Sequence, residues 1–164
     1  MPSQTDPGCG DEHTNPLILL GDDEAALISG LSETLEHHGF SVEQAADWPA
    51  LLDRLRPAAH DLLIVEMRLG QVDLVGRFAE LRGLTRAPVV FLTRNRVEAD
   101  RILALEQGAA DVLLKPVSGR EIVARIRAVL RRGAPAARPT EPPQAWRLAG
   151  GEPPPHAPSP ASRR

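Results

Sequence analysis

The sequence has little of three features that would indicate other classes of protein: cysteine, excess basic charge and long apolar runs. Cys9 is the only cysteine among 164 residues, which excludes an internal disulfide and favours a reducing compartment. The 19 Lys and Arg stand against 22 Asp and Glu, a formal net charge of -3, so no global positive field indicates nucleic acid or an anionic membrane. No run approaches the roughly 20 apolar residues of a membrane span, and the first fifteen residues lack the apolar core of a signal peptide. These absences predict a cytoplasmic protein without a membrane partner.

Proline divides the chain into a candidate domain and a tail. Nine of the 16 prolines follow Arg132, where the aliphatic pattern ends. This composition predicts a disordered tail over residues 133–164. Residues 1–15 are polar and are expected to form a disordered N-terminus. The segment between them, residues 16–132, is long enough for one domain with its own hydrophobic core.

Short apolar runs within that domain predict β-strands. Continuous rather than alternating apolarity is typical of strands buried on both faces of a parallel sheet. A fifth strand, Ser41–Ala45, mixes polar residues and is expected at an edge. The four apolar runs are 17–20, 62–65, 89–92 and 112–114.

Helical patterns separate these strands. The first helix carries Leu27, Leu31 and Leu35 before Gly39, and the second covers about residues 47–56. The third carries Leu74, Phe78 and Leu81, and the fourth carries Ile102, Leu103 and Leu105. The fifth opens with Ser118 and Glu121 at the spacing of a capping box. This alternation predicts an α/β fold of five βα units, a doubly wound parallel sheet with helices on both faces.

Ligands of such sheets bind outside the carboxyl ends of the strands. There the sequence places three carboxylates, a hydroxyl and an amine. Taken singly, each has an ordinary structural explanation, such as a helix N-cap for either aspartate or a solvated loop charge for the lysine. Their joint occurrence favours one functional crevice. The residues are Asp22 and Asp23 after the first strand, Glu66 after the third, Thr93 after the fourth, and Lys115 and Pro116 after the fifth.

This pattern resembles the receiver domains of two-component response regulators over roughly residues 16–132. The resemblance implies a flavodoxin-like fold with strand order 2-1-3-4-5. It implies that Asp22 and Asp23 hold Mg²⁺ beside an acceptor carboxylate, since magnesium takes hard oxygen ligands. Thr93 and Lys115 would contact the phosphoryl oxygens, and the bond before Pro116 would be cis.

Three departures from the family pattern bear on mechanism. Glu66 occupies the position of the phosphate-accepting aspartate. Its longer side chain displaces the acceptor oxygen by about 1 Å, which can lower the rate of phosphoryl transfer about 100-fold. Magnesium at Asp22, Asp23 and Glu66 is therefore expected to bind weakly or not at all. Arg94 follows Thr93 where a small residue is usual, and it is expected to cover the site or to pair with Glu66. Val112 stands where many relatives have an aromatic switch residue.

The resemblance narrows to OmpR-type regulators, which dimerise through the fourth helix, fifth strand and fifth helix. It implies that Arg101 faces Glu121 of the partner subunit and that Asp111 faces Arg125. The alternative is a solvated charged face, because an exposed ion pair contributes only about 0–1 kcal/mol. Residues 145–148 faintly resemble the start of a winged-helix domain, so the tail is interpreted as the remnant of a linker to a missing output domain. No specific DNA binding is therefore expected.

Three functions remain open on this evidence. The first is a phosphorylation-independent signalling module that acts through protein contacts, with a histidine kinase or another regulator as partner. The second is a conventional receiver in which Glu66, Asp22 or Asp23 accepts the phosphoryl group. The third and weakest is a Mg²⁺-dependent phosphohydrolase, because neither an aspartate nucleophile nor a separate acid-base group is available. The chain is expected not to be an enzyme.

Overall fold

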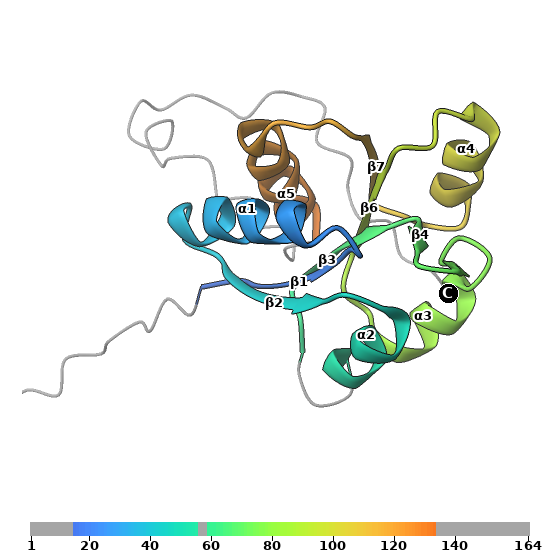
Figure 1. Ribbon diagram of the computed structural model, residues 1–164, viewed down its shortest axis with the longest axis horizontal. Helices are drawn as coiled ribbons and strands as arrows, with labels where there is room; N and C mark the ends of the chain where they lie inside the picture. Colours follow the sequence, from blue (N-terminus) through green and yellow to red (C-terminus); the bar gives the residue numbers. More distant parts are fainter. Residues whose placement is uncertain (1–14, 56–58, 134–164) are drawn as a thin grey trace, which may run out of the picture. The chain divides into compact units, whose positions relative to one another are not determined.

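The computed structural model describes residues 15–55 and 59–133, drawn in colour in Figure 1. The predicted disordered ends, 1–15 and 133–164, lie outside the described residues except for their innermost positions. The winged-helix remnant proposed at 145–148 also lies outside them. In the part that is described, no helix combines the length and apolar character needed to cross a membrane.

The domain is built on a five-stranded sheet whose neighbouring strands are all parallel. The strand order is β2-β1-β3-β6-β7. Since β6 and β7 are the fourth and fifth strands of this sheet, the predicted order 2-1-3-4-5 is confirmed. The partly exposed β2 forms an edge, as its mixed composition predicted. The strands are β1 (Leu17–Gly21), β2 (Ser41–Ala45), β3 (Leu62–Glu66), β6 (Val89–Thr93) and β7 (Asp111–Leu114).

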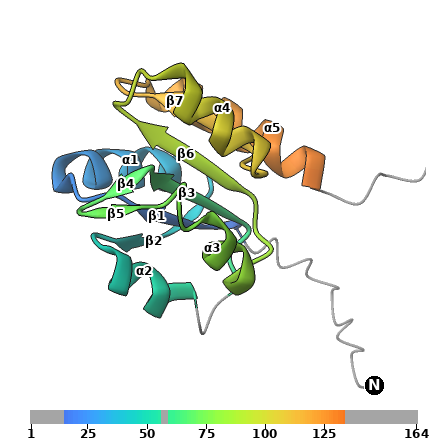
Figure 2. The same cartoon turned by 90° about the vertical axis from the view of Figure 1, so that its right-hand side faces the viewer.

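Helices cover both faces of the sheet. Figure 1 shows α1 and α5 on one face and α2 and α3 on the other, and Figure 2 shows the same layers from the side. The predicted α/β architecture is confirmed. The helices are α1 (Ala25–His37), α2 (Trp48–Leu55), α3 (Phe78–Leu84), α4 (Glu98–Glu106) and α5 (Gly119–Gly133).

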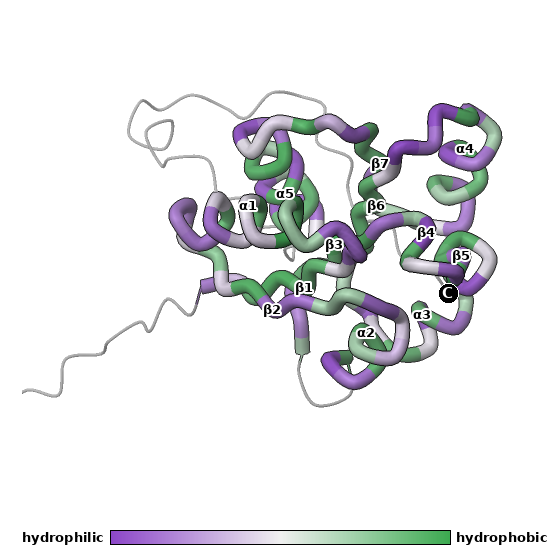
Figure 3. The backbone as a smooth tube through the Cα atoms, in the orientation of Figure 1, coloured by the Kyte–Doolittle hydropathy of each residue, from purple (hydrophilic) through white to green (hydrophobic). Residues whose placement is uncertain are grey.

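Two hydrophobic clusters lie on opposite faces of the sheet. Successive strand residues point to opposite faces, so Ile18 and Leu20 join the cluster that includes Leu35 of α1, whereas Leu19 joins the one that includes Phe78 of α3. The hydrophobic colouring of the central strands in Figure 3 follows this burial on both faces. The prediction that these apolar runs form strands buried on both faces is therefore confirmed.

Two local features differ from the sequence expectations. An antiparallel hairpin of β4 (Arg68–Leu69) and β5 (Val72–Asp73) follows β3, with Gly70 in the turn at φ 62°. Each strand of the hairpin is too short to show a period of two. Leu74, expected on the third helix, is fully buried but precedes α3, which begins at Phe78.

The fourth helix also packs differently from an ordinary amphipathic helix. Only Ala104 of α4 is buried. Ile102, Leu103 and Leu105 are each nearly half exposed. The apolar residues that identified this helix thus lie largely on its solvent side, and α4 is held against the sheet chiefly at β7.

Candidate functional site

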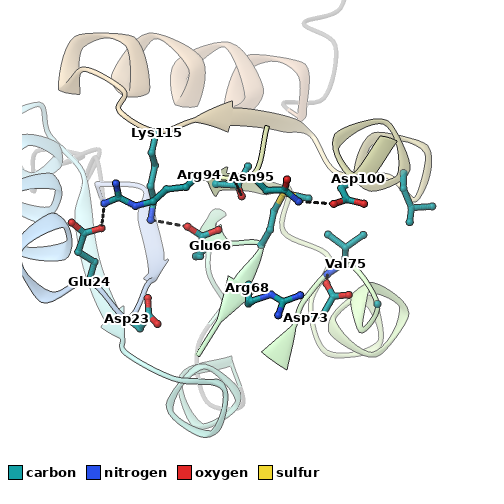
Figure 4. Close-up of a pocket in the computed structure, with 14 residues that line it drawn as sticks. Asp23, Glu24, Glu66, Arg68, Asp73, Val75, Arg94, Asn95, Asp100 and Lys115 are labelled. Atoms are coloured by element: carbon teal, nitrogen blue, oxygen red, sulfur yellow. Dashed lines mark hydrogen bonds and ion pairs between the residues drawn. The ribbon is translucent and has the colours of Figure 1, made fainter. Parts of the chain in front are cut away.

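A cleft of about 570 Å³ opens at the carboxyl ends of the strands. The parallel register brings these ends together: Glu66 of β3 is paired in register with Leu92 of β6, and Thr93 of β6 with Leu114, the residue before Lys115. Figure 4 shows Lys115 extending toward Glu66 at the centre of this cleft. The predicted crevice is therefore present and is lined by Asp23, Glu66, Thr93, Arg94 and Lys115, among other residues.

Lys115 is the centre of a buried ion-pair triad. Its Nζ lies 2.7 Å from Oε2 of Glu66 and 2.6 Å from Oδ2 of Asp22. The side chains of Lys115 and Asp22 are 4% and 1% exposed, and that of Glu66 is 11% exposed. The backbone N–H of Lys115 donates to the carbonyl oxygen of Thr93 at 2.8 Å, which fixes the point where the chain leaves β7.

Two effects act on the charge of Lys115. Burial by itself lowers the pKa of Lys115, but hydrogen bonds to Asp22 and Glu66 outweigh it, and the pKa stands above its ordinary value. The charged ammonium is therefore the stable form in the folded protein. Because the two carboxylates share one cation, the triad keeps one net negative charge when all three groups are ionised.

The two aspartates after β1 have different environments. Asp22 is fully buried, and its Oδ1 accepts the backbone N–H of Glu24 at 2.9 Å. Asp23 is exposed and lines the cleft. The alternative of an aspartate N-cap is wrong, because the N-cap of α1 is Glu24 and its side chain makes no capping bond.

The magnesium set predicted from the resemblance is not assembled. Within residues 15–55 and 59–133, no group of three His, Cys, Asp or Glu side chains is placed to hold a metal ion. The Lys115 ammonium contacts both Asp22 and Glu66, two of the carboxylates that were expected to bind the metal. With Asp23 apart from this triad, the three residues as arranged do not fit Mg²⁺.

Arg94 does not pair with Glu66, so that expectation is wrong. Its Nη2 instead lies 2.5 Å from Oε2 of Glu24, with both side chains substantially exposed. This hydrogen bond raises the pKa of Arg94 and lowers the pKa of Glu24. Arg94 and Glu24 both line the cleft, and Figure 4 shows Arg94 reaching toward Glu24. The other expectation, that Arg94 covers the site, stays a prediction.

The hydroxyl of Thr93 is directed to its own loop. Thr93 is buried, and its Oγ1 accepts the backbone N–H of Asn95 at 3.0 Å. Asn95 in turn donates from Nδ2 to Oδ2 of Asp100 at 2.5 Å and accepts the N–H of Val97. Sequence analysis missed this connection from β6 to the first turn of α4, because a polar loop carries no periodic signal.

The hairpin supplies a further wall that the sequence analysis did not include. Arg68 and Asp73 are directly opposite each other in the register of β4 and β5, and both line the cleft. Asp73 also accepts the backbone N–H of Val75 at 3.0 Å. Among the described residues, the lining thus contains three cations against five carboxylates: Arg68, Arg94 and Lys115 against Asp23, Glu24, Glu66, Asp73 and Asp100.

The remaining predicted residues lie around the β7 edge. Val112 is half-buried and packs against the cluster that contains α2 and α3 residues, while Pro116 is exposed and follows a cis bond, as the resemblance implied. Arg125 pairs within the chain with Asp111 at 3.3 Å and Glu121 at 3.8 Å. The contact assigned to Asp111 and Arg125 across a dimer axis is thus already made inside one subunit.

Comparison with known proteins identifies this architecture. The family model for the response regulator receiver domain matches residues 18–127. The transcriptional regulatory protein CpxR of Escherichia coli K12 is 44% identical over 115 residues, covering 70% of this chain and 49% of CpxR. The sensory transduction protein RegX3 of Mycobacterium tuberculosis H37Rv is 36% identical over 116 residues, covering 71% of this chain and 51% of RegX3. The chain therefore spans about half the length of these curated relatives.

Solved structures agree with the fold. A two-component response regulator from Clostridium difficile has a TM-score of 0.70 at 26% identity, covering 74% of this chain and all of that one. A response regulator from Burkholderia pseudomallei, solved with a phosphorylated aspartic acid and a calcium ion, has a TM-score of 0.65 at 24% identity, covering 73% and 71%. The chain belongs to the response regulator receiver domain family of two-component signalling.

Proposed function

We propose that this chain is an atypical receiver module that signals through protein contacts without phosphorylation at Glu66, and that it is not an enzyme. The observation that carries the proposal is the contact of 2.7 Å between Glu66 and Lys115 inside the buried triad. A carboxylate held in this way already occupies the cation that would otherwise contact the oxygens of an arriving phosphoryl group. A histidine kinase or another regulator is the kind of partner that the family suggests.

Phosphoryl transfer depends mostly on positioning and charge neutralisation. Three features oppose both requirements. The glutamate at position 66 moves the acceptor oxygen by about one methylene, on the order of 1 Å. Lys115 is already engaged by two carboxylates, and the Arg94–Glu24 pair stands at the cleft. Together these features support a site that does not run the usual transfer.

A direct test is incubation of the full chain with acetyl phosphate and Mg²⁺, followed by intact mass measurement. The expected result is no gain of a phosphoryl group. The double variant Glu66→Asp with Arg94→Ala is the matched positive control, since it restores the shorter acceptor and removes the arginine from the cleft. A stoichiometric adduct on the unaltered chain would refute the proposal, and continuous phosphate release would instead support the phosphohydrolase.

We further propose that partner contacts include self-association through α4, β7 and α5, as in OmpR-type regulators. The nearly half-exposed Ile102 and Leu105 of α4 supply apolar area, and the charges of Asp111, Glu121 and Arg125 lie together near it. Arg101, the fourth residue of this proposed face, is partly buried.

Sedimentation tests both the dimer and the role of Glu66 as a phosphate substitute. Ile102→Glu is expected to weaken association by placing a charge in the apolar contact. Glu66→Gln is expected to weaken it as well if the Glu66 contact with Lys115 favours the associating conformation. Unchanged or stronger association of Glu66→Gln would contradict that role, and association unaffected by Ile102→Glu would contradict the face.

A further inference from the structure

A second concave surface lies at the amino ends of β6 and β7, away from the Glu66 cleft. It has a volume of about 340 Å³ and is lined by three arginines over an apolar floor. A neighbouring hollow shares Arg82 and Arg86 with it and adds the exposed Leu84. We call this surface the arginine groove. Its lining includes Arg82, Arg86, Arg132, Pro88, Ala110 and Val129.

One arginine of the groove is anchored by contacts within the domain. Nη1 of Arg82 donates to the carbonyl oxygen of Ala87 at 2.6 Å, and its guanidinium lies 5.3 Å from the ring centroid of Phe78. Burial lowers the pKa of Arg82, which is the direction expected for a partly buried cation without a carboxylate partner. The groove therefore presents a preordered positive charge, flanked by the exposed Arg86 and Arg132.

Among the residues that the structure describes, this groove carries an excess of positive charge. In the described part of the chain, no carboxylate lines either hollow, and none lies within ion-pair distance of Arg82, Arg86 or Arg132. The Glu66 cleft, by contrast, is lined by five carboxylates. This local excess of positive charge arises in a chain whose formal net charge is -3.

We propose that the arginine groove docks an acidic peptide segment of a partner protein. Arginine forks bind carboxylates, often by two hydrogen bonds. The floor of Pro88, Ala110 and Val129 and the exposed Leu84 suit apolar side chains interspersed among the acidic ones. A nucleic-acid backbone offers no such apolar side chains, and the negative net charge of this chain disfavours a long polyanion.

The groove and the Glu66 cleft lie at opposite ends of the sheet, because Pro88 and Ala110 precede β6 and β7 whereas Thr93 and Lys115 mark their far ends. A partner held in the groove leaves the cleft uncovered. Docking in the groove does not depend on whether Glu66 accepts a phosphoryl group, so each of the two proposals can be tested without the other.

Fluorescence anisotropy of a labelled peptide of repeated Glu-Glu-Leu units, titrated with the full chain, tests the proposal. Saturable binding that weakens with salt is expected, and binding of a Gln-Gln-Leu peptide is expected to be much weaker. The double variant Arg86→Glu with Arg132→Glu should weaken binding at least about tenfold, since it removes two ion pairs and adds repulsion. The matched control is Arg96→Glu with Arg120→Glu, which changes two exposed arginines at the other end of the sheet and should bind as the unaltered chain does.

Circular dichroism melting identifies any variant that fails to fold, and Arg86→Ala and Arg132→Ala then provide milder tests with the same expected direction. Backbone amide shifts in the presence of the peptide should concentrate at Ala110 and Val129 and leave the Glu66 cleft unchanged. No saturable binding, or equal loss in the control variant, would overturn the proposal. Binding of duplex DNA that competes with the peptide at these arginines would overturn it as well, because the groove would then recognise polyanions in general.

Discussion

Replacing Lys115 by methionine tests whether the triad holds the site together. The substitution keeps the length of the side chain but removes the one cation shared by Asp22 and Glu66, whose oxygens lie 2.6 and 2.7 Å from its Nζ. Two carboxylates that are 1% and 11% exposed would then face each other without a cation between them. Removal of one member of a buried ion pair destabilises a protein by about 3–5 kcal/mol. This is a large part of the free energy of unfolding of a typical domain, about 5–15 kcal/mol.

Urea unfolding followed by far-ultraviolet circular dichroism measures this loss. Relative to Lys115→Met, the double variant Lys115→Met with Glu66→Gln should regain about 1 kcal/mol or more of unfolding free energy, because only the Asp22 charge remains uncompensated. This size agrees with the coupling of about 0.5–3 kcal/mol that is typical of residues in contact. Glu66→Gln alone should cost much less than Lys115→Met, since Lys115 keeps Asp22. The reasoning is refuted if Lys115→Met loses less than about 1 kcal/mol or if the second substitution restores nothing, because the triad would then be a solvated cluster.

Three further predictions address single groups. Lys115 is the only lysine of the chain, so the single ¹³Cε signal of lysine-labelled protein should titrate with a pKa above the ordinary lysine value. The stability that the charged ammonium supplies is complete below the unfolded-state pKa of about 10.4 and is lost as pH rises through the pKa of the folded protein. Titration at or below that pKa would contradict the hydrogen bonds assigned to it. Arg94→Ala should leave the urea midpoint of unfolding essentially unchanged, because its pair with Glu24 is exposed to solvent; a clear fall of the midpoint would indicate a structural role. Gly30→Ala should stabilise α1 by up to about 1 kcal/mol, whereas Gly119→Ala should destabilise the domain because the new Cβ would lie 2.7 Å from a threonine side chain of α1. Equal melting temperatures for these two variants would contradict that packing.

The fold was predictable because its signals are continuous along the chain. Runs such as 62–65 and 89–92 are apolar without alternation, and a parallel sheet buried on both faces is the structure that accommodates them. The topology then places the strand ends together, which is why Thr93 and Lys115 were located correctly. The two-residue strands β4 and β5 were missed because hairpins this short leave no periodic pattern.

The detailed pairing in the cleft was less predictable, because long side chains select partners by three-dimensional distance. Glu24 and Glu66 both line the cleft with Arg94, and the sequence analysis considered only Glu66 as its partner. In the structure the Lys115 ammonium contacts Glu66 as well as Asp22, and Arg94 pairs with the exposed carboxylate of Glu24. Sequence order alone does not encode such competition between cations.

These contacts bear on how far Glu66 can substitute for a phosphoryl group. In a phosphorylated relative, the resemblance implies that both the threonine and the lysine contact the added oxygens. Here Glu66 contacts Lys115, whereas the Thr93 hydroxyl accepts the N–H of Asn95, which is tied to Asp100 of α4. A charge-assisted hydrogen bond contributes about 1.5–3 kcal/mol before the cost of desolvation. Moving a two-state domain from 1:99 to 99:1 needs about 5.5 kcal/mol. One such contact therefore biases the domain only in part, and the binding free energy of a protein partner has to supply the remainder, as the proposed contact-driven function requires.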